Sequence, residues 1–158
     1  MNDELLIEPT DCTRSSIIKV IGVGGGGGNA VANMYCEGLH DVRFLVCNTD
    51  RKALESSPVS DRLQLGPGLG AGGDPETGRA LAEGDLEAID KIFDEDTKMV
   101  FITAGMGGGT GTGASPIIAR EAKSRGLLTV AIVTIPFLFE LQRQVDKALD
   151  GVERLAKE

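Results

Sequence analysis

The amino-acid sequence predicts an α/β fold, a Rossmann-like three-layer domain with a mostly parallel sheet and helices on both faces. Three observations support this prediction. Short apolar runs alternate with segments of helical spacing, which is typical of a parallel sheet with right-handed crossovers. Runs such as 17–23 and 99–104 are apolar at nearly every position, as expected of strands buried on both faces. Glycine-rich stretches follow strands, where the loops of such a fold border a crevice.

The first unit of the chain reads as strand, glycine loop and helix. Residues 1–16 mix acidic and small polar residues, and we expect them to form a disordered N-terminal tail. A strand is expected over 17–23, and the five glycines of 24–28 follow it. Helical spacing then covers 30–38, which places Asn29 at the position of a helix N-cap.

The second strand is expected over 42–47 and ends in the polar residues 48–50. In open α/β sheets the carboxyl ends of the strands face the ligand, so these polar residues border the predicted crevice. A short helical turn near 53–54 and a strand over 62–65 are expected next.

The rest of the chain continues the alternation of strands and helices. A third glycine-rich stretch spans 66–74, and a helix opens at Pro75, a residue tolerated in a first helical turn. Helical spacing continues, after Gly84, as far as Phe93. The remaining elements are a strand over 99–104, a glycine loop over 105–113, a helix over 114–125, a strand over 127–134 and an amphipathic helix over 140–157. Residues 17–158 therefore read as one domain.

The composition excludes several classes of protein. A chain of 158 residues that is 41% hydrophobic can bury one core. The net charge of -8 argues against a nucleic-acid partner. Three cysteines and one histidine without metal-type spacing predict no metal site made of side chains. The acidic N-terminus and the lack of a long apolar run lead us to expect a cytoplasmic protein.

The stretch 105–113 has the character of a phosphate cradle. Glycines let a ligand approach backbone N–H groups closely, and the following helix adds a partial positive charge at its start. A tight turn that needs positive φ angles is the alternative, but it would need fewer glycines. We therefore predict that the loop binds phosphate.

The glycine loops favour a nucleoside triphosphate over a dinucleotide. The pattern G-x-G-x-x-G at 22–27 is weak by itself, and Asp50 is a late candidate for the acidic residue that would bind a dinucleotide ribose. A second phosphate loop at 105–113 suits a longer phosphate chain. No Gly-Lys-Ser/Thr follows these glycines, so backbone N–H groups must hold the phosphates without a P-loop lysine. An NAD-binding Rossmann domain and a nucleotide-binding scaffold without hydrolysis stay open at this point.

Several motifs lie between about Ile17 and Ala156. They are GGGTGTG at 107–113, GVGGGGGNAV at 22–31, Asn48-Thr49-Asp50, GLGAG at 68–72, Pro75-Glu76, and Pro136-Phe137 with Phe139-Glu140. Together these motifs resemble the tubulin/FtsZ superfamily of GTPases, and within it the bacterial cell-division branch.

The resemblance implies a binding site for GTP or GDP with Mg²⁺, the cation that the family pairs with its nucleotide. Thr110 would donate its hydroxyl to a phosphate, and Glu140 would bind the ribose. The implied contacts are Gly24, Gly25, Gly26, Gly27, Gly28 and Asn29 at the α- and β-phosphates and the sugar, Ala71, Gly72 and Gly73 near the γ-phosphate, and Gly105, Gly107, Gly108, Gly109, Thr110, Gly111 and Thr112 in the main phosphate loop.

This sequence departs from the family pattern in three places. Leu141 stands where the family usually has glycine. The arginine expected four positions after Glu140 is Gln144, with Arg143 one place earlier, so either residue is a candidate for the nucleotide contact. The segment between Gln64 and Gly70 is shorter than usual, which predicts a tighter third loop.

The resemblance also implies a GTPase that polymerises head to tail into the bacterial division ring. The family hydrolyses GTP at the subunit interface with a loop that follows a long central helix, and we expect this chain to end before both. No residue of the chain is expected to be catalytic, because Asp50, Asp74 and Glu76 are better read as helix caps or solvated acids. Other division proteins would bind C-terminal regions outside the chain, the membrane would be reached only through partners, and the location would be the cytoplasm at mid-cell.

Overall fold

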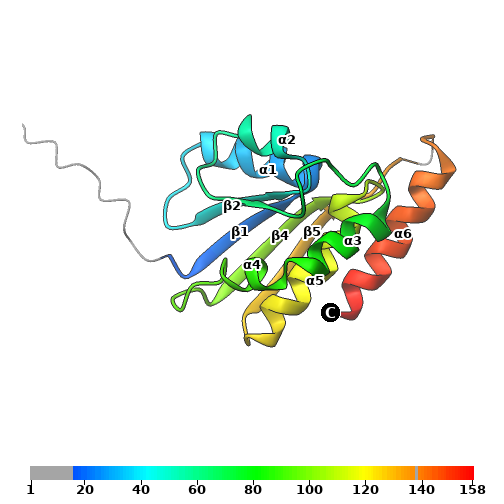
Figure 1. Cartoon of the computed structure of the whole chain (residues 1–158). Helices are drawn as coiled ribbons and strands as arrows, with labels where there is room; N and C mark the ends of the chain where they lie inside the picture. Colours follow the sequence, from blue (N-terminus) through cyan, green and yellow to red (C-terminus); the bar gives the residue numbers. More distant parts are fainter. Residues whose placement is uncertain (1–15, 138) are drawn as a thin grey trace, which may run out of the picture.

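The computed structural model describes residues 16–137 and 139–158 and has the predicted three-layer arrangement (Figure 1). The tail expected over 1–16 lies, apart from residue 16, outside the described residues. A parallel five-stranded sheet has the order β3-β2-β1-β4-β5. Its strands are β1 (Ile18–Val23), β2 (Arg43–Asn48), β3 (Arg62–Gln64), β4 (Met99–Gly105) and β5 (Leu128–Thr134).

Helices cover both faces of the sheet. Val31 and Leu54, from the first two helices, pack with Val20 and Phe44 on one face. The other four helices cover the opposite face in a larger apolar cluster. The helices are α1 (Gly24–Cys36), α2 (Arg51–Glu55), α3 (Pro75–Gly84), α4 (Leu86–Asp90), α5 (Thr110–Ser124) and α6 (Gln142–Lys157).

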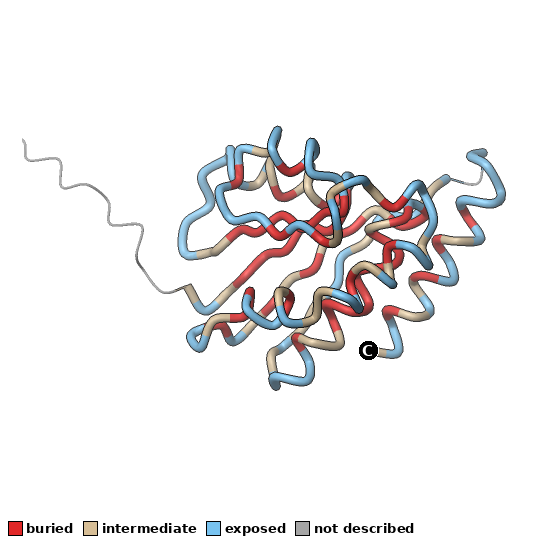
Figure 2. Tube along the Cα trace, in the orientation of Figure 1, coloured by how far each residue is buried: buried red, intermediate tan, exposed pale blue. Residues whose placement is uncertain are grey.

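The buried positions follow the central strands and α5 (Figure 2). Every residue from 111 to 119 of α5 is buried, although helices on a sheet usually keep one face in water. Helix α5 is enclosed because α3 and α6 pack beside it. The first turns of α5 are therefore held rigidly at the edge of the sheet.

Strand register brings the predicted glycine stretches together. In the sheet Val23 lies beside both Cys47 and Ala104, so β1, β2 and β4 end at the same level. The residues that follow these three strands consequently share one edge of the domain, as the sequence predicts for a parallel sheet.

The two glycine loops are shorter than predicted, because much of each glycine run is helical. Helix α1 begins at Gly24 and α5 begins at Thr110. The prediction that Asn29 is an N-cap is wrong, since Asn29 lies inside α1 and the N-cap residue is Val23. Glycine disfavours helices, but tertiary packing outweighs that preference here.

Close packing explains several of these helical glycines. A Cβ atom on Gly27 would overlap the carbonyl group of Thr103, and one on Gly113 would overlap the carbonyl group of Pro75. The glycines thus let α1 lie directly on β4 and let α5 lie directly on α3. Part of the glycine pattern that predicts a phosphate loop therefore comes from the need for close packing between elements.

Strand β5 is an edge strand, and its apolar side chains are less buried than a central strand would require. Leu128 is 61% exposed and Ile132 is 59% exposed. An unbroken apolar run therefore does not by itself identify a central strand. Among the described residues, no helix has both the length and the apolar character of a membrane span.

Candidate functional site

The segment after β2 is hydrogen-bonded to the third glycine stretch. The N–H of Gly70 donates to the carbonyl of Thr49 at 2.9 Å, and the N–H of Arg51 donates to the carbonyl of Gly68 at 3.1 Å. A further bridge pairs Asp50 with Leu69. The stretch 66–74 is therefore fixed against the end of β2.

The three glycine stretches are in close contact. A Cβ atom on Gly109 would lie 2.8 Å from the Cβ of Ala71 and 3.0 Å from the backbone nitrogen of Asp74. A Cβ atom on Gly24 would lie 2.9 Å from the backbone nitrogen of Gly111. There is no room for side chains between these segments, so their backbones form one surface.

Two helix N-termini at this surface have no side-chain cap. Helix α1 follows Val23 and α5 follows Gly109, neither of which carries a side-chain oxygen. The first N–H groups of a helix have no partner within it, and together with the helix dipole they favour an anion. The two glycine-rich helix starts can therefore bind negatively charged groups.

In contrast, the starts of the neighbouring helices α2 and α3 are capped by side chains. The carboxylate of Asp50 accepts hydrogen bonds from the N–H groups of Lys52 and Ala53 at the start of α2. The carboxylate of Asp74 accepts from the N–H groups of Glu76 and Thr77 at the start of α3. The prediction that Asp50 and Asp74 act as helix caps is confirmed.

Hydroxyl groups connect the main glycine loop to its surroundings. The Oγ1 atoms of Thr49 and Thr110 are 2.6 Å apart. The N–H of Gly107 donates to Oγ1 of Thr112 at 2.9 Å, and Thr112 is 2% exposed. Thr110 lies at the surface of the loop, whereas Thr112 lies beneath it and fixes its shape.

The start of α6 adjoins the same loop. The position of a Cβ atom on Gly107 is 3.1 Å from the carbonyl oxygen of Gln144. Glu140 accepts a hydrogen bond from the N–H of Phe137 at 3.1 Å. Arg143 and Gln144 are both exposed. The structure brings this segment near the glycine loop but does not choose between Arg143 and Gln144.

Sequence reasoning missed Lys147. Its ammonium group donates to the carbonyl of Gly73 at 2.7 Å, although the two residues are 74 positions apart. A P-loop motif places its lysine within the glycine loop itself, whereas Lys147 reaches the glycine stretch through the packing of α6. Its position among the charged residues of an amphipathic helix was the available signal, and that signal is weak.

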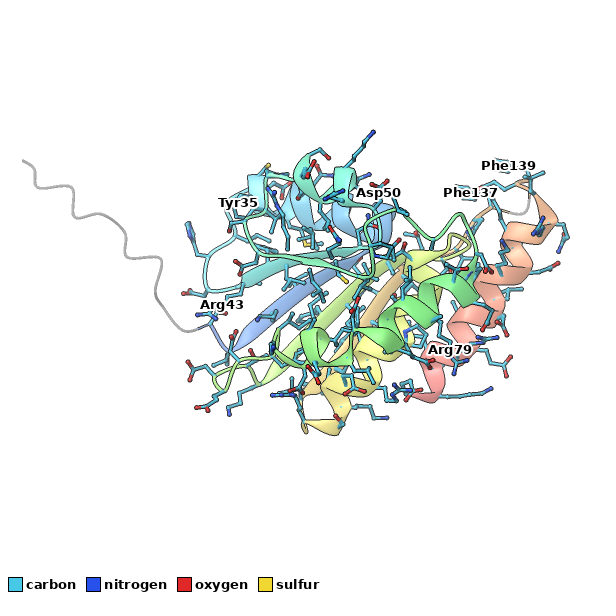
Figure 3. All side chains as sticks on the ribbon, in the orientation of Figure 1. Tyr35, Arg43, Asp50, Arg79, Phe137 and Phe139 are labelled. Atoms are coloured by element: carbon cyan, nitrogen blue, oxygen red, sulfur yellow. The ribbon has the colours of Figure 1, made fainter. Side chains whose placement is uncertain are left out.

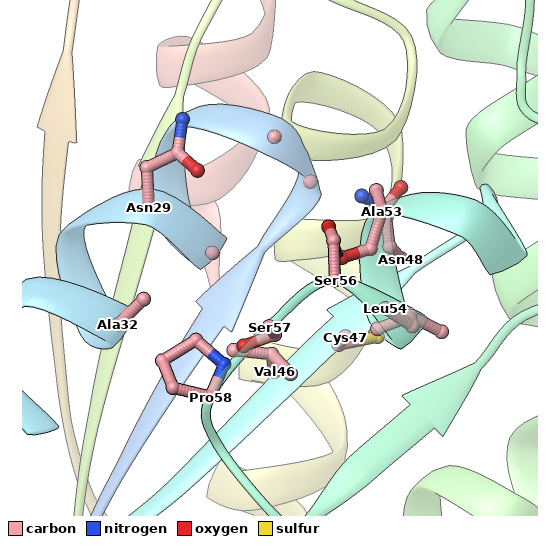
Figure 4. Close-up of a pocket in the computed structure, with 13 residues that line it drawn as sticks. Asn29, Ala32, Val46, Cys47, Asn48, Ala53, Leu54, Ser56, Ser57 and Pro58 are labelled. Carbon is pink, nitrogen blue, oxygen red and sulfur yellow. Dashed lines mark hydrogen bonds between the residues drawn. The ribbon is translucent and has the colours of Figure 1, made fainter.

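A cavity of about 130 Å³ adjoins the uncapped end of α1 (Figure 4). Asn29 lies on one side of it and Asn48 lies across from it, at the end of β2. Ser56, Ser57 and Pro58 also line the cavity, and the sequence analysis assigned them no role. The wall formed by α1 contains Gly24, Gly25 and Gly28, so the cavity is continuous with the glycine surface.

The described residues offer neither a side-chain cluster for a metal ion nor a reactive buried thiol. They contain no group of three histidine, cysteine or acidic side chains that could hold a metal ion. Burial, together with the charge of Asp85, raises the pKa of the Cys47 thiol, which keeps it protonated. Glu76 forms an ion pair with Arg154 at 2.6 Å. In Figure 3, Asp50 lies at the start of α2, just after the end of β2.

Comparisons with known proteins agree with the geometry. The model of the Tubulin/FtsZ family, GTPase domain, matches residues 17–158. The chain is 58% identical over 163 residues to a cell division protein FtsZ of Porphyromonas gingivalis, covering 99% of the chain and 36% of that protein. It is 52% identical over 142 residues to a cell division protein FtsZ of Aquifex aeolicus, covering 87% of the chain and 38% of that protein. The chain thus spans less than half the length of these relatives.

Solved structures with the same fold include an empty FtsZ dimer from M. jannaschii. Its TM-score is 0.86 at 39% identity, covering 90% of this chain and 42% of that one. A GTPgS-bound protofilament of CetZ2 from Haloferax volcanii has a TM-score of 0.77 at 28% identity, covering 89% of this chain and 46% of that one.

Proposed function

Because this chain belongs to the Tubulin/FtsZ family of GTPases, we propose that it is the GTP-binding domain of an FtsZ-like cytoskeletal GTPase. The observation that carries the proposal is the meeting of two uncapped helix starts, those of α1 and α5, on one glycine surface. Two such anion sites side by side suit a chain of phosphates better than a single phosphate.

The bound nucleotide would contact each glycine stretch in turn. Residues 24–29 would bind the α- and β-phosphates and the sugar, 71–73 would approach the γ-phosphate, and 105–112 would form the main phosphate loop. Support comes from the close contacts among these stretches. Thr110 would donate its hydroxyl to a phosphate, and Glu140 would bind the ribose. Thr112 is better placed to shape the loop than to contact the ligand.

Magnesium would accompany the nucleotide. A hard cation of this kind prefers oxygen ligands and keeps several water molecules, so phosphate oxygens can hold it without a cluster of side chains. The described residues fit that mode of binding, because the uncapped starts of α1 and α5 can bind the phosphates whose oxygens would hold the ion. Bound there, the ion would neutralise negative charge on the phosphates.

Self-association would complete the hydrolytic site. The carboxylates at the edge of the crevice are engaged, because Asp50 and Asp74 cap helices and Glu76 is paired with Arg154. A water-activating group would then come from a neighbouring subunit, in a head-to-tail contact that generates filaments. Two structural relatives, an FtsZ dimer and a CetZ2 protofilament, support such self-association.

The cellular role would be that of a division-ring protein in the cytoplasm at mid-cell. The cell division relatives support this role. Other division proteins would bind parts of the longer protein outside this chain, and the membrane would be reached through such partners. The net charge of -8 supports the expectation of no nucleic-acid partner.

Calorimetric titration with GTP, ATP and NAD, combined with a phosphate-release assay on the same samples, tests the proposal. We expect GTP to bind preferentially and its hydrolysis by the chain alone to be slow. Preferential binding of NAD would instead support a dinucleotide site. Fast hydrolysis whose specific rate is independent of protein concentration would contradict completion of the site by a neighbour.

A further inference from the structure

Lys147 connects α6 to the third glycine stretch of the candidate site, residues 66–74. Its ammonium group donates to the carbonyl oxygen of Gly73 at 2.7 Å. Lys147 is half-buried, and Val145 and Ala148, in the same turn of α6, are buried against the domain. The lysine is thus anchored on a packed helix while its charged end reaches the loop.

The loop that Lys147 reaches has an unusual backbone. Gly72 and Gly73 have φ angles of 58° and 72°, in the left-handed region. Ala71, the residue before them, is buried and lies against Gly109 of the main glycine loop. A hydrogen bond at the Gly73 carbonyl therefore fixes the end of a segment whose beginning is fixed by Ala71.

We propose that Lys147 determines how strongly the site prefers a nucleoside triphosphate over a nucleoside diphosphate. This inference rests on the proposed function, in which 71–73 approach the terminal phosphate. Lys147 contributes in two ways: it positions the backbone of Gly73, and it places a positive charge beside the segment that meets the added phosphate.

Negative charge beside the loop gives the charge of Lys147 something to offset. The chain has a net charge of -8, and Asp74 and Glu76 stand next to the loop. A hydrogen bond from the Thr77 hydroxyl lowers the pKa of Asp74, backbone N–H groups and the nearby charge of Lys147 lower it further, and these effects outweigh the desolvation that raises it. Asp74 consequently stays ionised and repels a terminal phosphate. The charge of Lys147 offsets this repulsion.

An ammonium group can also serve two acceptors at once. It carries three donor hydrogens, and the Gly73 carbonyl takes one of them. Two donors are left for phosphate oxygens or for bridging water. The lysine that sequence motifs place inside a P-loop would here come from a helix late in the chain.

Dissociation constants for GTP and GDP, measured by calorimetry in the same buffer, test the inference. The variants are Lys147→Met, which removes the charge, and Lys147→Arg, which keeps it. Lys157→Met is the matched control, because Lys157 lies on the same helix and pairs with Glu153 at 3.0 Å. Lys147→Met is expected to weaken GTP binding roughly fivefold and GDP binding by less than about twofold. The effect is modest because Lys147 is only partly buried and water screens its charge.

The control variant should leave both constants unchanged, and Lys147→Arg should keep most of the preference for GTP. An unchanged ratio of the two constants in Lys147→Met would overturn the inference, whether both affinities fall together or neither falls. Thermal unfolding of the variants without nucleotide monitors the fold, and Lys147→Gln replaces Lys147→Met if that variant does not fold. If the unsubstituted chain bound neither nucleotide, the proposed function itself would fail.

Discussion

The hydroxyl groups of Thr49 and Thr110 lie 2.6 Å apart and connect the end of β2 to the first residue of α5. Thr49 is 1% exposed, so its hydroxyl has little access to water. Two hydroxyls at this distance share one hydrogen. If Thr110 donates its own hydrogen to a phosphate, Thr49 must donate to Thr110, and the three groups form a hydrogen-bonded chain.

Removing the Thr49 hydroxyl should therefore weaken nucleotide binding without removing any direct contact. We expect Thr49→Val to weaken GTP binding by about 1 kcal/mol, the typical value of one hydrogen bond, and Thr49→Ser to restore it. Thr97→Val is the control, because the Thr97 hydroxyl is buried without a partner among the described residues. Calorimetry measures the affinities, and equal GTP affinity of Thr49→Val and the unsubstituted chain would contradict the hydrogen-bonded chain.

Gly109 is a glycine of the main loop at which a side chain should harm the cradle. A methyl group there would meet the Cβ of Ala71 at 2.8 Å and the backbone of Asp74. We expect Gly109→Ala to weaken GTP binding by about 1–3 kcal/mol, because the two loops must move apart. Gly84→Ala is the control, since a Cβ atom there meets no atom of the described chain within 4 Å. Unchanged affinity in a folded Gly109→Ala protein would show that the cradle lies elsewhere.

Arg143 and Gln144 compete for one predicted role at the nucleotide. Both are exposed at the start of α6, close to the glycine loop. A charge-assisted hydrogen bond to phosphate is stronger than a neutral one, so we expect Arg143→Ala to weaken GTP binding more than Gln144→Ala does. The two variants are compared in one titration series, and the reverse order would reject Arg143 as the replacement for the family arginine.

Acid should destabilise the domain through Asp94, which lies far from the site at the amino ends of the strands. Burial alone would raise the pKa of Asp94, but hydrogen bonds and charges from Lys19 and Arg43 outweigh it and lower the pKa below its ordinary value. Lys19 is 4% exposed and bonds to Asp94 at 2.7 Å. A lowered folded-state pKa stabilises the fold above the unfolded pKa of about 4, and this stabilisation is lost as pH falls through the folded value.

Urea unfolding between about pH 3 and 7 measures this effect. We expect Asp94→Asn to be less stable than the unsubstituted chain at neutral pH, with a difference that shrinks in acid. Glu83→Gln is the control, because the Glu83 pair with Arg79 is exposed and should contribute little. A difference that stayed constant across this range would contradict the role assigned to the Asp94 carboxylate.

Local patterns predicted the strands and the glycine surface, because apolar runs and glycine runs are properties of neighbouring residues. The sequence placed the starts of α1 and α5 several residues too far along the chain, since glycine argues against helix by propensity. Contacts that exist only in the folded domain, of Gly27 with β4 and of Gly113 with α3, explain why glycines stand inside these helices. The edge position of β5 was not predictable from its apolar run. The Lys147 contact with Gly73 was missed because the packing of α6 against a distant loop leaves no spacing signal in the sequence.

The central claim is that the open starts of α1 and α5 bind the phosphates of one nucleotide. A nuclear magnetic resonance titration of the ¹⁵N-labelled chain with GTP tests it directly, because amide signals report hydrogen bonds at individual backbone N–H groups. We expect the largest shifts at the amides of 24–27 and 109–111, with little change at the capped starts of α2 and α3. Saturable shifts confined to the capped helices, or to the amides of Ser56 and Ser57 in the cavity wall, would contradict the claim.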